Sequence, residues 1–445
     1  MAVGFPDATF VGIDLSSRQI ELGREAVRTL GVKNLDLRAA SITDVGPDWG
    51  TFDYILCHGV YSWVPDEVQA KILEVCRTNL SADGVEYVSY NTYPGWHLRG
   101  MLREIMCFHA ARFTQPEEQV KEARELLAFL TETSAGQNTP HALALAQETE
   151  LLRQQSDSYL YHEHLEEFNS PCYFFEFAGR VKAAGLQYLG DAAVGSMFPL
   201  GLPPKATDTL GRLCRDQIQL EQYLDFVRNR TFRASVVCHA RVPLVRHIDA
   251  SVIEDLYLSS SAKREAGDGP ARYTLDGGAT LTVSDPSLAA ALDGIVAAWP
   301  ASVPFDAVAA GAERKQLAGG LLNLLLNGGV TASVVPVRCV ATVSDTPDVG
   351  PLARHFAAKE GWVPTARHTV LRLDEFGRRV VPLLDGKRTR DAVLDELVNQ
   401  FRTGRLTMHQ DGGRIRDEAK GRELMTAGVN VVLEQLRHGG GLAAE

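Results

Sequence analysis

The first hundred residues alternate short apolar runs with amphipathic segments, and this alternation constrains the fold more than any other feature. Strands are expected at residues 8–14, 35–39, 52–57 and 85–91, which are rich in apolar and β-branched or aromatic side chains. Helices are expected at residues 16–30 and 68–79, where apolar residues recur at helical spacing. Strand–helix–strand units of this spacing form right-handed crossovers, so the sequence predicts a doubly wound α/β sheet.

The residues that follow these strands are the candidate site, because ligands of such sheets bind at the carboxyl ends of the strands. They are Asp14 and residues 41–44, 58–63 and 91–96. The carboxylate of Asp14 can accept hydrogen bonds from both hydroxyls of an adenosine ribose. In the next turn, Ile42 can pack on the adenine face while Ser41 meets its edge. A helix N-cap and an ordinary polar turn are the alternatives, but together the two features favour an adenosine ligand.

Composition excludes several classes of protein. The 45 basic and 56 acidic residues give a net charge of −11, which argues against a broad nucleic-acid binder and against attachment to an anionic membrane surface. The longest apolar runs, such as residues 319–326, are far shorter than the ~20 residues that span a bilayer, and no signal peptide is visible. Seven scattered cysteines without CxxC spacing argue against disulfides and structural zinc, so a cytoplasmic location is expected.

Four long strings are more specific than these short motifs. They are HGVYSWVP (58–65), YNTYPGWH (90–97), YHEHLEEFNSPCYFFEF (161–177) and EQYLDFVRNRTFRASVVCH (221–239). With Asp14, SITD (41–44) and FDYILC (52–57), they resemble class I S-adenosylmethionine-dependent methyltransferases. The resemblance covers most of the chain and is to the branch with a methyltransferase regulatory domain, which includes bacterial protein-lysine methyltransferases that modify outer-membrane proteins. It implies a Rossmann-like sheet and S-adenosylmethionine as cofactor.

The resemblance also implies roles for individual residues. The cofactor-binding residues are expected to be Asp14, Leu15, Ser41, Ile42, His58 and Gly59. The acceptor side is expected to be formed by Tyr61, Trp63 and Tyr93. An aromatic wall suits a cationic sulfonium and an amine acceptor, and in-line methyl transfer needs alignment more than a strong general base. Packing of Tyr61 and Trp63 against the next helix, and aromatic packing around the turn at Pro94, are the alternatives.

One element of the family pattern is not found. The glycine-rich loop of the E/DxGxGxG type should precede the strand that ends at Asp14, but only MAVGFPD stands there. We therefore expect the chain to be truncated at its N-terminus, with an acid and a GxG-type loop encoded in frame upstream. This chain alone is then expected to bind the cofactor poorly. A true pseudo-enzyme is the alternative explanation.

The remaining sequence indicates further domains. Residues 1–240 are expected to form the methyltransferase core without its first strand, closed by strands at 186–191 and 232–238. A helical hairpin at residues 114–157 is predicted from a capping-box spacing and an apolar stripe, and it is expected to act as a lid or dimerisation arm. His162 and His164 are two residues apart and point apart on a helix, so no metal site is expected.

Two small winged-helix-like α+β domains are expected to follow, a middle regulatory domain at 241–345 and a C-terminal domain at 365–438. In the middle domain we expect a strand pair within 271–283, helices at 286–299 and 318–327, and a strand at 333–338. In the C-terminal domain we expect a strand at 368–373 and helices at 388–402 and 423–437. Its 14 basic and 11 acidic residues give a net charge of only +3, so DNA binding is weakly supported.

The sequence therefore predicts an S-adenosylmethionine-dependent methyltransferase, acting by N-methylation of a protein lysine. Its expected partner is a protein substrate, with outer-membrane and surface proteins as candidates. A second copy of the chain is expected to bind through the helical insertion. No membrane or nucleic-acid partner is expected. A methyltransferase for a small molecule or another macromolecule remains an alternative. A non-catalytic binding or regulatory protein with a decayed methyltransferase domain is the other.

Overall fold

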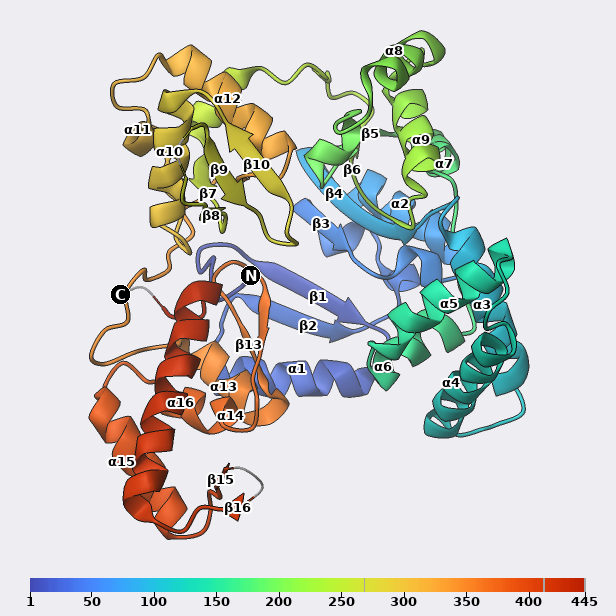
Figure 1. Ribbon diagram of the computed structural model, residues 1–445. Helices are drawn as coiled ribbons and strands as arrows, with labels where there is room; N and C mark the ends of the chain where they lie inside the picture. Colours follow the sequence, from blue (N-terminus) through green and yellow to red (C-terminus); the bar gives the residue numbers. More distant parts are fainter. Residues whose placement is uncertain (268, 411–412, 444–445) are drawn as a thin grey trace. The chain divides into compact units, whose positions relative to one another are not determined.

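The computed structural model describes residues 1–267, 269–410 and 413–443 (Figure 1). The chain divides into two compact units. One of them, the site unit, consists of Ile13–Ser17 and Arg38–Arg246, and it contains all the predicted site residues. The other, the terminal unit, consists of Met1–Gly12, Arg18–Leu37 and His247–Glu445. Among the described residues, no helix combines the length and the apolar character that crossing a membrane requires.

The N-terminal segment folds as predicted into strand, helix and strand. These elements are β1 (Phe10–Asp14), α1 (Ser17–Leu30) and β2 (Leu35–Ala39), and the two strands form a sheet of their own. The guanidinium of Arg24 on α1 donates two hydrogen bonds to the carbonyl of Leu37, at 2.9 and 2.6 Å. These bonds hold the helix against β2.

The main sheet has four strands in the order β3-β4-β6-β5. They are β3 (Phe52–Cys57), β4 (Leu80–Asn91), β5 (Leu186–Asp191) and β6 (Phe232–His239). β3 and β4 are parallel and joined by α2 (Asp66–Asn79), whereas β6 runs antiparallel to both β4 and β5. In the described part of the chain no strand pairs with the other edge of β3.

The predicted insertion, residues 114–157, contains α4 (Pro116–Thr133) and α5 (Pro140–Arg153). It follows α3 (Trp96–Ala110) and leads into α6 (Asp157–Leu160). Figure 1 shows α4 and α5 side by side as a hairpin. Thr139 caps α5, because its hydroxyl accepts a hydrogen bond from the N–H of Ala142 at 3.2 Å. Leu127 of α4 and Leu145 of α5 are buried in the hairpin core.

Three further α-helices complete the site unit: α7 (Phe174–Ala183), α8 (Pro204–Leu213) and α9 (Gln217–Arg228). α2 and α7 cover the apolar core of the sheet. β6 is tied to α9 by Arg233, which is fully buried. Its guanidinium lies 2.7 Å from Asp225 and 3.0 Å from Glu221, and it stacks 3.7 Å from the ring centroid of Phe174. These contacts compensate the buried charges.

The middle part of the terminal unit, in its described residues, contains two small sheets and three α-helices. The strands are β7 (Tyr257–Ser259), β8 (Lys263–Arg264), β9 (Ala271–Thr274), β10 (Thr280–Val283), β11 (Val303–Pro304) and β12 (Thr331–Ser333). The helices are α10 (Pro286–Ala297), α11 (Phe305–Val308) and α12 (Arg314–Leu326). The expected strand pair and the two expected helices are present. The prediction of a strand at 333–338 is wrong, because β12 pairs with β7 and ends at Ser333. Pro336 has no N–H with which to continue the ladder.

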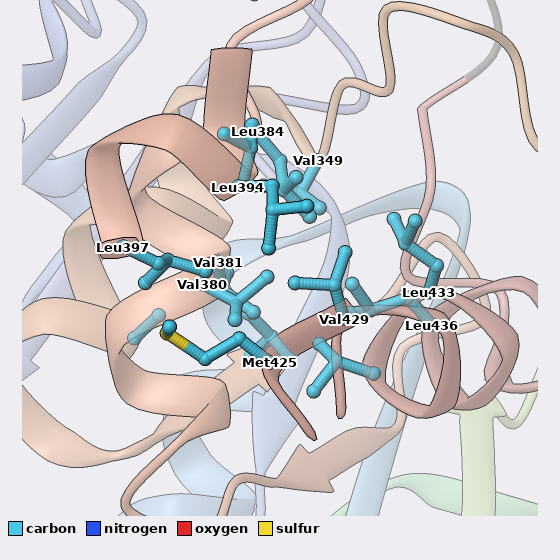
Figure 2. Close-up of a cluster of buried hydrophobic side chains, with 14 of the residues drawn as sticks. Val349, Val380, Val381, Leu384, Leu394, Leu397, Met425, Val429, Leu433 and Leu436 are labelled. Atoms are coloured by element: carbon cyan, nitrogen blue, oxygen red, sulfur yellow. The ribbon is translucent and has the colours of Figure 1, made fainter. Parts of the chain in front are cut away.

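The C-terminal part has its own apolar core, which Figure 2 shows around Val380, Leu397, Met425 and Val429. Its helices are α13 (Gly350–Glu360), α14 (Gly377–Val380), α15 (Arg390–Arg402) and α16 (Glu418–Gly439). Its strands are β13 (Trp362–Pro364), β14 (Val370–Arg372), β15 (His409–Gln410) and β16 (Gly413–Arg414). The strand and both helices expected here are present, with different ends.

Arg367 is one of the residues that join the C-terminal part to the middle part. Arg367 donates to the carbonyl of Pro300 at 2.9 Å and to the hydroxyl of Ser259 at 2.9 Å. Its guanidinium lies 4.2 Å from the centroid of Trp299, a cation–π contact. The indole N–H of Trp299 in turn donates to the carbonyl of His438.

Candidate functional site

β1 ends at Asp14, whose side chain is exposed to solvent. Its Oδ1 accepts a hydrogen bond from the backbone N–H of Ser16 at 2.7 Å, which closes a local turn just before α1 begins at Ser17. The N–H of Ala40 donates to the carbonyl of Asp14 at 3.1 Å. Leu15 is 81% exposed. The structure therefore places the end of β1 directly beside the turn that follows β2.

That turn is a short 3-10 helix, Ile42–Asp44, held by a capping box. The hydroxyl of Ser41 accepts from the N–H of Thr43 at 3.2 Å, and the carboxylate of Asp44 accepts from the N–H of Ser41 at 3.0 Å. Ile42 is half-buried, with part of its side chain open. The turn is thus rigid, and it presents Ser41 and Ile42 next to Asp14.

The turn after β3 carries His58 and Gly59, both exposed. The N–H of Gly59 donates to the hydroxyl of Ser89 at 2.8 Å, and that oxygen lies 3.2 Å from Nδ1 of His58. Nδ1 of His58 is also 3.1 Å from the hydroxyl of Tyr87. Gly59 has φ +67°, a conformation that favours glycine. These bonds attach the turn to the carboxyl-terminal half of β4.

Tyr61 begins a second short 3-10 helix, Tyr61–Trp63, and its ring is fully buried. It packs edge-on against Phe177 with ring centroids 5.4 Å apart, and burial raises the pKa of its hydroxyl to about 12. The side chain of Gln69 donates to the carbonyl of Tyr61 at 2.9 Å and accepts from Arg180 at 2.7 Å. Together, Tyr61, Gln69 and Arg180 line a cavity of about 480 Å³. Tyr61 therefore takes the packing role considered as its alternative.

Trp63 ends the same turn and is half-buried. Its ring meets that of Trp96 edge-on, with centroids 6.3 Å apart, and Trp96 stacks on His164 at 6.1 Å. Burial lowers the pKa of His164 to about 4, so its imidazole is neutral at pH 7. The three rings form the first of two aromatic groups beyond the end of β4.

Tyr93 belongs to the second aromatic group. Its ring stacks on that of His97, with centroids 4.1 Å apart and an interplanar angle of 14°. Nε2 of His97 lies 3.1 Å from the hydroxyl of Tyr173. The structure therefore places Tyr93 in a partly exposed stack and Trp63 in a neighbouring group of the same unit.

Two amides at this end of the sheet have no role assigned from the sequence, although Asn91 lies in the candidate stretch 91–96. Asn91, the last residue of β4, is only 2% exposed, and its Nδ2 lies 3.5 Å from Oδ1 of Asn169. A signal was available, because Asn91 follows Tyr87 and Ser89 at every second position and so lies on the same face of the strand. Nothing in the sequence indicates that Asn169 lies next to it.

Three family models match the chain. A methyltransferase domain matches residues 1–84, and a predicted methyltransferase regulatory domain matches residues 156–239. The C-terminal winged helix domain of PKMT matches residues 345–440. The regulatory-domain match includes β5 and β6, which complete the main sheet.

Individual proteins give longer matches. RP789 of Rickettsia prowazekii is 31% identical over 98% of this chain and 82% of its own length. RP028 of the same organism is 42% identical over 39% of this chain and 69% of its own length. The solved structure of PKMT2 from Rickettsia typhi is 28% identical and covers all of this chain and 91% of its own, with a TM-score of 0.86. Its complex with AdoHcy (S-adenosylhomocysteine) gives a TM-score of 0.88.

The α/β sheet, the matched domains and the AdoHcy-bound relative together define a class I S-adenosylmethionine-dependent methyltransferase. The chain belongs to the same family as RP789 of Rickettsia prowazekii and is similar to PKMT2 of Rickettsia typhi. Its fold is the predicted one, including the winged helix domain at the C-terminus. Its cofactor is S-adenosylmethionine.

Proposed function

We propose that the protein transfers the methyl group of S-adenosylmethionine to the side-chain nitrogen of a protein lysine. The observation that carries this proposal is the aromatic lining beyond β4, where Trp63 and Tyr93 lie in two neighbouring ring groups. Aromatic faces attract cations and accept the apolar stem of a lysine. The likeness to PKMT2 and the resemblance to protein-lysine methyltransferases support the same acceptor.

The adenosine part of the cofactor fits the residues that are present. We assign its ribose to the exposed carboxylate of Asp14, with Leu15 beside it, and its adenine to Ser41 and Ile42 in the adjoining turn. A capping box holds that turn in place. The 445 residues contain no glycine-rich loop, so we assign no residue to the methionine part.

His58 and Gly59 complete the proposed cofactor side. The open space beside the α-carbon of Gly59 leaves its backbone accessible to a ligand, and the hydroxyl of Ser89 fixes its N–H. When bound, S-adenosylmethionine supplies an electrophilic methyl group on a sulfonium. The residues of the chain only need to align that methyl with the attacking nitrogen and to exclude water.

We also propose the partners and location that the sequence predicts. The substrate is a protein, with outer-membrane or surface proteins as the first class to test. A second copy of the chain binds through the helical insertion, which exposes Phe129 and Leu143. The free thiols of all seven cysteines support a reducing, cytoplasmic location.

Label transfer tests the acceptor. The protein is incubated with S-adenosylmethionine carrying an isotopic label in its methyl group, together with bacterial surface proteins or with a small-molecule extract. We expect label in proteins, recovered as methyl-lysine after hydrolysis. Label recovered only in small molecules, or cofactor binding without any transfer, contradicts the proposal and favours one of the two alternatives.

A further inference from the structure

The carboxyl end of β4 contains buried polar atoms that the fold itself leaves unsatisfied. Nδ2 of Asn169 is buried without a hydrogen-bond partner among the described residues. The same holds, within that part of the chain, for Nε1 of Trp96 and Nδ1 of His164. Native proteins satisfy nearly all such groups, because burying them unpaired costs free energy. Several of them close to one strand end indicate that a polar ligand group is to be received there.

Asn91 and Asn169 are the centre of this arrangement. The distance of 3.5 Å between Nδ2 of Asn91 and Oδ1 of Asn169 is at the limit of a hydrogen bond, so the amides engage each other weakly. An amide turned over about its last side-chain torsion exchanges its oxygen and nitrogen. When both amides are turned over, the hydrogen bond between them is kept, and the unpaired atom of Asn169 is its oxygen. In this arrangement the pair presents oxygens to a ligand that donates N–H groups.

The backbone around this pair is firmly held. The N–H of Asn91 donates to the hydroxyl of Ser62 at 2.8 Å, and its carbonyl accepts from the N–H of Cys172 at 3.2 Å. The carbonyl of Ser62 accepts a hydrogen bond from the N–H of Ser170 at 2.7 Å. Ser170 directly follows Asn169 in the sequence. Three segments distant in sequence thus position the two amides.

The pair also lies between the proposed cofactor turn and the aromatic wall. Asn91 is two residues beyond Ser89 on one face of β4, about 7 Å along the strand. Ser89 holds Gly59 of the cofactor turn, whereas Ser62, bonded to Asn91, precedes Trp63. An acceptor nitrogen bound by the two amides is therefore close to the proposed cofactor turn and to the aromatic wall.

We propose that Asn91 and Asn169 bind the methyl-accepting nitrogen through their amide oxygens. This inference rests on the proposed function. A neutral primary amine donates its two N–H groups to the two oxygens, which leaves its lone pair free to attack. A bond forms between nitrogen and the methyl carbon while the carbon–sulfur bond breaks, with its electron pair remaining on sulfur. The methylated nitrogen becomes positively charged and then releases a proton to water.

The neutral character of these amides matters for the reaction. A carboxylate in their place would stabilise the ammonium form of the lysine and raise its pKa. Amide oxygens orient the amine without this effect. The pair is thus suited to a reaction whose nucleophile is the uncharged amine.

The test compares Asn91→Ala, Asn91→Asp and Asn169→Ala with the unchanged protein. We expect each alanine variant to lower kcat/KM for a lysine peptide by about tenfold, the effect of one hydrogen bond, with AdoHcy affinity unchanged. Asn91→Asp, which is nearly isosteric, should move the rising limb of the pH–rate profile to higher pH. Binding of the peptide in the presence of AdoHcy, measured by calorimetry, should weaken in both alanine variants.

Asn79→Ala is the matched control. Asn79 is also a buried asparagine, but it directly precedes β4, at the end opposite to Asn91. Its amide donates to the carbonyls of Gly46 and Gly50. It should lower the melting temperature and leave kcat/KM unchanged below that temperature. Unchanged kinetics, peptide binding and pH profile in the Asn91 and Asn169 variants would overturn the inference. A wild-type protein that methylates no lysine would instead contradict the proposed function.

Discussion

Gly59 donates its backbone N–H to the hydroxyl of Ser89 over 2.8 Å. This bond attaches the turn after β3 to the strand that leads to Asn91, so the proposed cofactor side and acceptor side share one element. Because β3 and β4 are parallel, their carboxyl ends meet at one edge of the sheet. The catalytic arrangement we propose follows from that edge, and four further predictions test it and the fold around it.

Asp14→Ala should weaken AdoHcy binding by about 1.5–3 kcal/mol, the range for hydrogen bonds to a charged group. The reason is that the exposed carboxylate at the end of β1 has capacity left beyond its bond to Ser16. Calorimetry measures the affinity. Asp83→Ala removes an exposed carboxylate at the start of β4 and should leave binding unchanged. Equal affinities for both variants would remove Asp14 from the site.

Trp63→Ala and Tyr61→Ala should have opposite profiles. Tyr61 is fully buried against Phe177, so its loss should destabilise the fold by about 3–5 kcal/mol. Trp63 is half-buried, and its replacement should reduce turnover much more than stability or AdoHcy affinity. Tyr93→Ala should behave like Trp63→Ala. Melting temperatures and steady-state kinetics separate the effects, and a parallel loss of stability and activity at Trp63 and Tyr93 would favour a packing role.

The ends of three strands show how much the sequence could predict. The runs at 35–39, 52–57 and 186–191 have the bounds expected, because apolar residues alternate or cluster within five or six positions in each. The strand at 333–338 failed because the ladder partner in β7 lies some 75 residues away and Pro336 interrupts the run.

The candidate site was predictable only in part, for a similar reason. Asp14 and Ser41 follow strands directly, so the position of each could be read from its own segment. Asn169 approaches Asn91 only after α3 to α6 have folded between them, which no local pattern indicates. Likewise, the burial of Arg233 depends on Asp225 and Glu221 facing it from α9.

Glu86 should make the stability of the protein depend on pH. Its side chain on β4 is fully buried, and the hydrogen-bonding group that faces its carboxylate is the thiol of Cys76, a weak donor. Burial raises its pKa from 4.5 to about 8. The folded state therefore keeps a proton that the unfolded state releases above pH 4.5, and stability falls as the pH rises from there to about 8.

Between these limits Glu86 should cost about 1.4 kcal/mol of unfolding free energy per pH unit. Urea unfolding at several pH values measures this slope. Glu86→Gln should flatten it and be the more stable protein at the alkaline end. Glu74→Gln, which alters an exposed carboxylate paired with Lys71, should keep the wild-type slope. Identical slopes for Glu86→Gln and wild type would contradict the assignment.

The helical insertion should mediate self-association, because it presents apolar side chains without covering them. Phe129 on α4 is 60% exposed and Leu143 on α5 is 58% exposed, whereas Leu127 and Leu145 on the same helices are buried. Phe129→Glu with Leu143→Glu should lower the molecular mass measured by light scattering and leave the melting temperature unchanged. Leu127→Glu, by contrast, should disrupt the hairpin core itself.

Deletion of residues 115–156 should give the same smaller assembly or open the active site to water. A wild-type protein that is already monomeric, with activity retained after the deletion, would contradict both roles of the insertion.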